Sequence, residues 1–150
     1  MQIETLRFGT IEIPEEAVLT FPQGVLGFAE AQRFCLLPYA PSHLLRWLQS
    51  VEDPTLAFLT VEPHQFFPSY EIVLSDADMR SLELDRPEDT AVLALLTISR
   101  DQQAVTADLA GPIVINIRNR RGRQIVVDDP RYATKHLVAR LGEALAKGAK

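Results

Sequence analysis

The chain has 150 residues, of which 47% are hydrophobic and 23% charged, and its formal net charge is −5. This length suits a single domain spanning residues 1–150, which buries enough surface to fold without disulfides or a structural metal. The composition excludes a disordered chain, a disulfide scaffold and a coiled coil. Because a negative chain repels polyanions and attracts basic proteins, we expect a protein partner and no direct contact with nucleic acid.

Membrane and metal signals are both weak. No apolar run approaches the roughly 18 residues of a membrane span, and the start of the chain lacks the basic and apolar regions of a signal peptide. We therefore expect a cytoplasmic protein without membrane contact. The single cysteine, Cys35, and three scattered histidines show no metal-binding or redox spacing. We expect no metal and no cofactor, and we expect Cys35 to lie on a buried strand.

Short segments dominate the first half of the chain, because glycine and proline recur too often for long helices. Residues 10–13 and 70–74 alternate apolar and polar side chains, which predicts strands, and residues 33–37 form a third candidate. Residues 47–51 and 56–61 flank a turn-forming segment and predict a hairpin.

A helix is the alternative for the first arm of that hairpin. Ser42 could cap it, and Leu44, Leu45 and Leu48 would lie along one side. Further on, Ser75 precedes two aspartates and predicts a short capped helix.

The second half of the chain predicts a sheet followed by a helix. Strands are expected at 91–98, 105–109, 113–118 and 124–127, with turns at 110–112, joining the second and third strands, and at 119–122. After Asp129 and Pro130 the apolar period changes to about 3.6, through Leu137, Val138, Leu141 and Leu145. This predicts a C-terminal helix over about 130–147. The expected fold is mainly β, a small antiparallel β-barrel-like or sandwich domain with a short helix and a C-terminal helix.

Two motifs could contact nucleic acid. Gly24 and Gly27 form a GxxG, which clamps phosphates in KH domains, but no lysine or arginine is adjacent. A tight turn with positive φ at both glycines, anchored by Phe21 and Phe28, is the favoured interpretation.

The basic turn is the second such motif and contains Arg118, Arg120, Arg121 and Arg123. It supports an alternative function, a small RNA-binding β-barrel that uses the Arg118–Arg123 turn to contact phosphates. A solvated turn that protects a strand edge is favoured, because no aromatic residues are interleaved to stack on bases.

Catalytic motifs are not apparent. The acidic pairs fall at predicted turns and helix starts, and the chain contains no nucleophile elbow, triad order or nucleotide-binding fingerprint. We therefore expect no enzymatic activity, with an unrecognised hydrolase as a third alternative. The acidic residues suit an electronegative surface that steers a basic protein partner.

Several stretches in order resemble the bacterial flagellar assembly factor FliW family. They are Gly9-Thr10-Ile11-Glu12-Ile13, Phe21-Pro22-Gln23-Gly24-Val25-Leu26-Gly27-Phe28, Trp47-Leu48-Gln49-Ser50-Val51-Glu52-Asp53-Pro54 with Leu56-Ala57-Phe58, and Gly111-Pro112-Ile113-Val114-Ile115-Asn116 with Gln124 and Tyr132. Each stretch is short, but the ordered combination runs through nearly the whole chain.

The resemblance implies a cytoplasmic, non-catalytic β protein that binds two partners. One is the translational repressor CsrA, whose repression of flagellin mRNA is relieved by binding, and the other is flagellin itself, bound in a chaperone-like manner. Competition or coupling between the two ligands through one protein would make a homeostatic switch. CsrA binds RNA and carries basic surface, which suits an acidic partner. We expect a monomer when the protein is free, and an open sheet edge could accept a strand from either partner.

Partner-binding residues are predicted by combining an aromatic anchor with acidic steering. The predicted set is Trp47, Gln49, Glu52, Asp53, Glu71, Asp76, Asp78 and Asn116. One departure from the family pattern is Asp108, which stands where an asparagine is expected. A carboxylate there lacks the donors of an amide, so the local network could differ.

Overall fold

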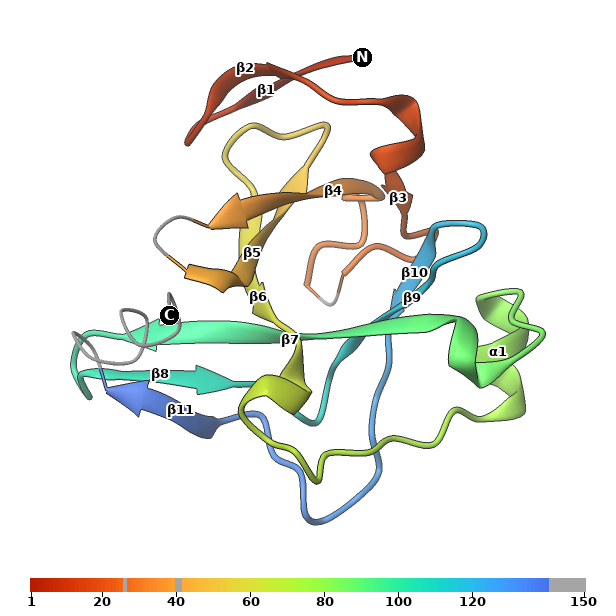
Figure 1. Ribbon diagram of the computed structural model, residues 1–150, viewed down its shortest axis with the longest axis vertical. Helices are drawn as coiled ribbons and strands as arrows, with labels where there is room; N and C mark the ends of the chain where they lie inside the picture. The colour runs from red at the N-terminus through yellow and green to blue at the C-terminus, as the bar shows by residue number, and fades with distance from the viewer. Residues whose placement is uncertain (26, 40–41, 141–150) are drawn as a thin grey trace.

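The computed structural model describes residues 1–25, 27–39 and 42–140, and its elements are mostly strands (Figure 1). The strands are β1 (Gln2–Thr5), β2 (Gly9–Glu12), β3 (Leu19–Thr20), β4 (Arg33–Tyr39), β5 (Ser42–Ser50), β6 (Ala57–Val61), β7 (Thr90–Ser99), β8 (Ala104–Ala107), β9 (Ile113–Asn116), β10 (Arg121–Gln124) and β11 (His136–Arg140). One short α-helix, α1 (Asp76–Ser81), and three 3₁₀ turns, η1 (Glu15–Ala17), η2 (Pro63–Gln65) and η3 (Pro87–Asp89), complete the described elements.

The central strands close into a barrel. Their order is β7, β6, β5, β4, β3, β10 and β9, and β9 returns to pair with β7. All these pairings are antiparallel except β10 with β3, which is a parallel contact at Arg121 and Thr20. The prediction of a mainly β, barrel-like fold is therefore confirmed.

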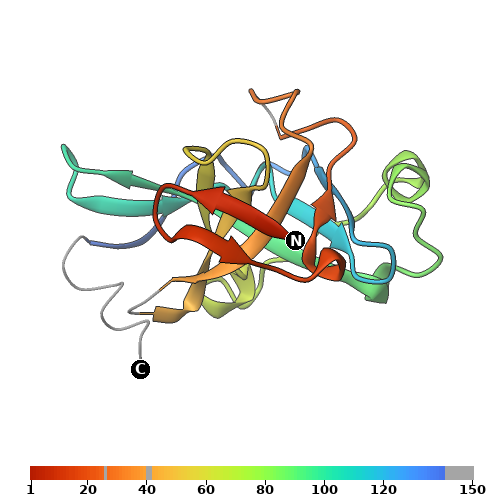
Figure 2. The ribbon, with the colours of Figure 1, turned by 90° about the horizontal axis from the view of Figure 1, so that it is seen from above.

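Strand β7 belongs to the barrel and to an outer sheet. Its first residues, Thr90–Leu93, pair with β9, whereas Leu96–Ser99 pair with β8, which in turn pairs with β11. Figure 2 shows the β7–β8 end and α1 projecting on opposite sides of the barrel. Strands β8 and β9 thus lie end to end along one edge of β7. The turn predicted at 110–112 to join these two strands is wrong, because residues 108–112 connect them without reversing the chain.

The barrel interior is filled by aromatic and aliphatic side chains. Phe21 and Phe34 are fully buried and meet edge to face, with ring centroids 5.4 Å apart. Leu48, Leu93 and Ile113 pack around them. Phe21 directly follows β3 and the other side chains lie on strands throughout the chain, so burial of this cluster holds the barrel together.

The N-terminal hairpin β1–β2 forms a separate two-stranded sheet over β4 and β5 (Figure 1). Ile3 and Ile13 pack there against Cys35 and Leu37. The amide of Leu6 donates to the carbonyl oxygen of Pro54 at 2.9 Å, which ties the hairpin tip to the β5–β6 loop.

Several local predictions are confirmed. Residues 47–51 and 56–61 form the β5–β6 hairpin, so the alternative helix capped by Ser42 is wrong. The capped helix is α1, where Ser75 and Asp78 form a reciprocal capping box. Gly24 and Gly27 have φ values of 68° and 87°, as the turn interpretation requires.

The strand predicted at 70–74 is wrong, although its alternation is real. Tyr70 is buried and donates its hydroxyl to the carbonyl oxygen of Leu109, and Ile72 and Leu74 face core clusters while Val73 is exposed. The segment pairs with no strand in the described part of the chain. Period-two burial therefore occurs here without a ladder, because side-chain packing and hydrogen bonds outside any sheet hold the segment.

The predicted turn at 119–122 and strand at 124–127 are displaced. The turn ends at Arg120, whose φ is 60°, and β10 begins at Arg121. Gly122 lies inside the strand, where an added Cβ would meet the ring of Phe21 at 2.6 Å. This glycine therefore permits close packing inside the barrel rather than forming the turn.

The C-terminal helix predicted over 130–147 is wrong for every residue that the structure describes. Residues 130–135 are not helical, and β11 pairs with β8 in antiparallel register. The carboxylate of Asp129 accepts from the amide of Arg131 at 2.9 Å, which forms an Asx turn instead of a helix cap. Residues 141–147 lie outside the described residues.

Candidate partner-binding surfaces

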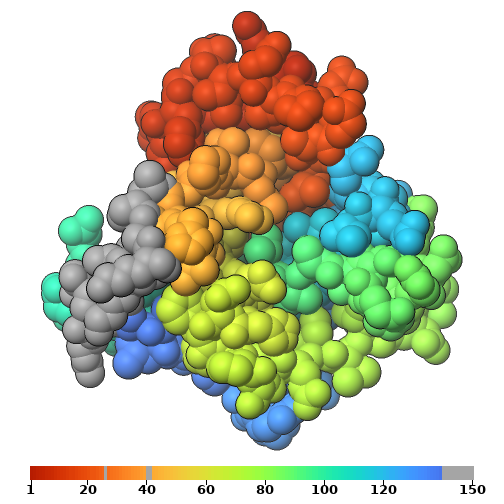
Figure 3. Space-filling model, in the orientation of Figure 1, coloured from red at the N-terminus to blue at the C-terminus, as the bar shows by residue number. Residues whose placement is uncertain are grey.

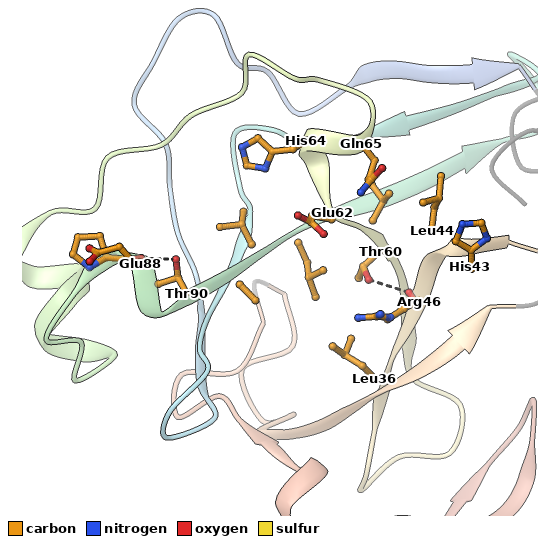
Figure 4. A pocket seen from close by; sticks show the side chains of 15 residues that line it. Leu36, His43, Leu44, Arg46, Thr60, Glu62, His64, Gln65, Glu88 and Thr90 are labelled. Atoms are coloured by element: carbon orange, nitrogen blue, oxygen red, sulfur yellow. Dashed lines mark hydrogen bonds between the residues drawn. The ribbon is translucent and has the colours of Figure 1, made fainter. Parts of the chain in front are cut away.

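An open groove of about 660 Å³ lies on the face drawn toward the viewer in Figures 3 and 4. It is bounded by β4 and β5 on one side and by β7 and the η2 and η3 turns on the other. The lining residues include Leu36, Arg46, Glu62, Thr90, Val92 and Leu93. Segments distant in sequence therefore create one concavity at the mouth of the barrel.

Charge in the groove is mixed. Arg46 lies on β5, whereas Glu62 directly precedes η2 and Glu88 lies within η3 (Figure 4). The Nε2 atom of His64 donates to the carbonyl oxygen of Tyr70 at 2.8 Å. Two carboxylates against one guanidinium leave a weakly acidic lining, which suits a polypeptide segment with a modest positive charge.

A second hollow of about 430 Å³ lies beside the β5–β6 loop. Phe28, Ala31 and Leu56 supply apolar lining, while Glu52 and Asp53 supply acidic groups. Phe28 is 45% exposed and packs edge to face on Phe58, so the predicted anchoring by this side chain is partial.

The acidic side chains of the β5–β6 loop also stabilise its conformation. Glu52 accepts from the amides of Gln32 and Arg33 at 3.3 and 3.2 Å. Asp53 accepts from the amide and the hydroxyl of Thr55, and the hydroxyl hydrogen bond is the main reason that the pKa of Asp53 lies below its usual range. The Asp53 carboxylate is therefore ionised at neutral pH and exposed to a partner.

The basic turn is largely paired with acidic residues. Arg118 contacts Asp89 at 2.8 Å, Arg121 contacts Glu83 at 3.0 Å, and Arg123 contacts Asp78 at 3.9 Å, so the turn is fastened to α1 and η3. This neutralisation weakens the case for a phosphate-binding turn.

Asp89 makes the turn sensitive to acid. A hydrogen bond from Arg118 is the main reason that the pKa of Asp89 lies below its usual range, with a further contribution from Arg86. A lowered folded-state pKa stabilises the protein above about pH 4, and that contribution declines as pH falls through the folded value. We expect Asp89→Asn to have a lower free energy of unfolding than the parent at pH 7. At pH 3 the difference between the two proteins should be smaller. Urea unfolding of both proteins at the two pH values checks this. A stability difference between parent and variant that is larger at pH 3 than at pH 7 would contradict it.

The described residues offer little for metal or nucleophile chemistry. They contain no group of three histidine, cysteine, aspartate or glutamate residues that could hold a metal ion. Burial raises the pKa of the Cys35 thiol, which suits a packing role. In the same part of the chain, no helix is both long and apolar enough to cross a membrane.

Comparison with known proteins identifies the family. The family model described as FliW protein matches residues 2–138. The chain belongs to the FliW family. Curated flagellar assembly factors FliW from Geobacillus kaustophilus and Treponema pallidum are 40% and 35% identical over 136 and 148 residues. These alignments cover 91% of this chain and 94% of the first relative, and 98% of both chains for the second. A crystal structure of the flagellar assembly factor FliW superposes with a TM-score of 0.84 at 38% identity, covering 92% of this chain and 96% of that one.

Within this FliW fold, two predicted site residues on β5 make contacts with other parts of the same chain. Trp47 lies under the N-terminal hairpin, where the guanidinium of Arg7 stacks 3.9 Å from the ring centroid. Gln49 is fully buried, and its Nε2 atom lies 3.1–3.4 Å from carbonyl oxygens of Ser50, Asp53, Pro54 and Leu56. The buried side chain of Gln49 therefore stabilises the conformation of the β5–β6 loop.

Asn116 has a similar internal place in the FliW fold. It is 3% exposed, donates to the carbonyl oxygens of Leu82 and Glu83, and accepts from the amide of Arg118. These bonds connect the end of β9 to the segment after α1. Asp78 forms the capping box of α1, whereas Asp76 and Glu71 are exposed.

The structure does not bring the predicted site residues onto one surface. Glu52 and Asp53 share the β5–β6 loop, but Asp76 and Asp78 lie on α1 at a different side of the barrel (Figures 1 and 2). The groove-lining residues of this FliW chain were not among the predictions. Pro63, two residues beyond β6, was the sequence signal that could have indicated the groove. It marks the point where β6 separates from β7.

Asp108, at the position where an asparagine was expected, acts only as an acceptor in its hydrogen bonds. Its Oδ1 atom accepts from the amides of Ala110 and Gly111 at 3.0 and 2.8 Å. An asparagine oxygen can accept the same bonds. We therefore expect Asp108→Asn to change the free energy of unfolding by less than about 0.5 kcal/mol. Asp108→Ala should cost about 1–2 kcal/mol because both amides lose their acceptor. Urea denaturation distinguishes the two, and equal losses would contradict this role.

Proposed function

We propose that this protein is a non-enzymatic flagellar assembly factor of the cytoplasm that binds CsrA and flagellin. Binding of CsrA relieves repression of flagellin mRNA, and flagellin bound in a chaperone-like manner controls how much protein is free for CsrA. The observation that carries the proposal is the FliW family match, which extends over residues 2–138. The net charge of −5 supports it, since an acidic protein favours association with a basic RNA-binding partner.

The β5–β6 loop is the proposed contact for CsrA. It presents Glu52 and Asp53 beside the apolar hollow that contains Phe28, a combination of anchoring and steering groups. Exposed Asp76 and Glu71 contribute to the acidic field from elsewhere, and Gln49 supports the loop internally.

Neutralising Asp53 tests this assignment. Asp53→Asn keeps an oxygen that can accept from Thr55 but removes the exposed charge. We expect the association rate constant for CsrA to fall about two- to fivefold at low salt, because local steering is lost. The control Glu15→Gln removes the same charge at η1 and should have a smaller effect. Surface plasmon resonance measures both rates, and equal effects would contradict a role for this loop.

Binding itself is tested by calorimetric titration of the purified protein with CsrA and with flagellin from the same cell. The proposal expects saturable heat with each partner and a CsrA association rate that falls as salt rises. Absence of heat and of co-elution with both partners would overturn it.

A gel-shift assay with flagellin leader RNA distinguishes this function from RNA binding through the basic turn. The protein alone should leave the RNA unshifted, and its addition should abolish the shift that CsrA causes. A shift by the protein alone, lost on substitution of Arg120, would favour the RNA-binding alternative.

A further inference from the structure

One edge of β7 is open where it lines the groove. Residues Thr90–Leu93 pair with β9 on one side of the strand. On the other side, β6 pairs only with Ala94 and Leu95, through Val61 and Thr60. In Figure 1, β6 meets β7 near the middle of that strand, and the chain then continues into η2. Among the described residues, no strand covers the 90–93 edge.

The groove follows this edge. Thr90, Ala91, Val92 and Leu93 all line it, although successive side chains of a strand point to opposite faces. A groove that touches four consecutive residues must run along the strand edge. Figure 4 shows β7 passing through the groove in this way.

The direction of the backbone groups follows from the antiparallel register. The amide of Ile117 donates to the carbonyl oxygen of Asp89 at 2.9 Å, and these residues lie opposite each other in the ladder. Bonded and non-bonded pairs alternate in antiparallel ladders, so Ala91 and Leu93 bond to β9. The amides and carbonyls of Thr90 and Val92 therefore point into the groove.

Proline explains why β6 does not cover them. Extending the β6–β7 register past Val61 and Ala94 would place Pro63 opposite Val92. Proline has no N–H to donate, and here it begins the η2 turn that carries the chain away. The opening is therefore encoded in the sequence of this chain.

We propose that the groove binds an extended segment of a partner protein, which adds as a strand to β7 at Thr90–Leu93. The inference rests on the proposed function, because it says where a protein partner docks. Open backbone donors and acceptors select a polypeptide backbone. Leu36 and Leu93 offer apolar contacts at the barrel mouth, and Glu62 and Glu88 favour basic side chains, so the segment alternates apolar with polar or basic residues.

Residue-resolved amide exchange by NMR on the full chain is the decisive experiment, first alone and then saturated with flagellin or with CsrA. In the free protein, Thr90 and Val92 should exchange faster than Ala91 and Leu93. On saturation with the partner that docks here, protection at Thr90 and Val92 should rise at least about tenfold.

A charge-reversal pair gives an independent measurement. Glu62→Lys changes an exposed groove residue whose side chain makes no hydrogen bond or ion pair with the described residues, and it should weaken binding of that partner about tenfold. The control Glu16→Lys makes the same charge change at the exposed η1 turn and should alter binding by less than about twofold.

The outcomes separate the two proposals. Binding of both partners without added protection at Thr90 and Val92, or equal losses in the two charge-reversal variants, overturns the groove inference and leaves the proposed function standing. Failure of both partners to bind the parent protein overturns the proposed function and this inference together.

Discussion

Replacing Gly24 with alanine is expected to destabilise the protein by about 3 kcal/mol or more, through strain and overlap in the loop before β4. Gly24 has a φ of 68°, which is unfavourable for residues with a Cβ. A Cβ there would lie 2.6 Å from both the Cα and the carbonyl oxygen of Ala29, and would also overlap the carbonyl oxygen of Phe28. Because these are backbone atoms, the loop would have to move away from the core.

Gly27 provides the matched control in the same loop. Its φ is 87°, but an added Cβ would meet nothing within 4 Å. Gly27→Ala should therefore cost only the conformational term, about 1 kcal/mol. Thermal melts should show a fall in Tm of about 10 °C for Gly24→Ala and a much smaller one for Gly27→Ala. Equal falls would show that backbone overlap is not the main cost.

Gln49→Glu should be comparably damaging, at about 3–5 kcal/mol near neutral pH. The side-chain amide lies fully buried against four carbonyl oxygens, those of Ser50, Asp53, Pro54 and Leu56. A carboxylate of the same shape would bring an unpaired negative charge against acceptors. The Oε1 atom already has no hydrogen-bond partner, so nothing in the described structure compensates the charge.

Gln49→Met is the control that keeps the volume and removes both polar atoms. It should cost about 2 kcal/mol, since the loop carbonyls lose a donor but no charge is buried. Urea unfolding of the two variants measures the difference. A Gln49→Glu protein as stable as Gln49→Met would contradict the buried, structural role of this side chain.

Local signals predicted those parts of the fold in which the sequence and the tertiary structure agree. Proline and aspartate mark the β5–β6 turn, Ser75 and Asp78 cap α1, and Gly24 takes a positive φ. Each of these features depends on neighbours close in the chain, so a single sequence contains the information.

Long-range pairing overrode the local pattern at the C-terminus. The apolar spacing that includes Leu137 and Val138 suits a helix, but β8 offers an edge that residues 136–140 cover as a strand. Val138 then packs in the cluster around Tyr70 and Leu109. The position of that edge depends on how β7 is shared between two sheets, which no local pattern reveals.

The candidate site was predicted only in part for a similar reason. Charge and residue type singled out Glu52 and Asp53, which lie exposed on a loop, but also Gln49 and Asn116, whose side chains are buried. Polarity alone cannot distinguish a group that meets a partner from one that satisfies backbone carbonyls. The groove exists because β6 and β7 separate, and this can be seen only when the register between these two strands is known.

Closure of the barrel through β3 and β10 has a consequence for how the chain folds. The amide of Thr20 donates to the carbonyl oxygen of Arg120 at 2.9 Å, so the ring joins segments about a hundred residues apart. Contacts of such separation slow folding, because the loop must close before they form. During synthesis, the ring cannot be completed until residues 121–124 leave the ribosome. Nascent chains therefore pass through an interval in which strand edges are unpaired. During this interval the chain is most prone to aggregate with other chains.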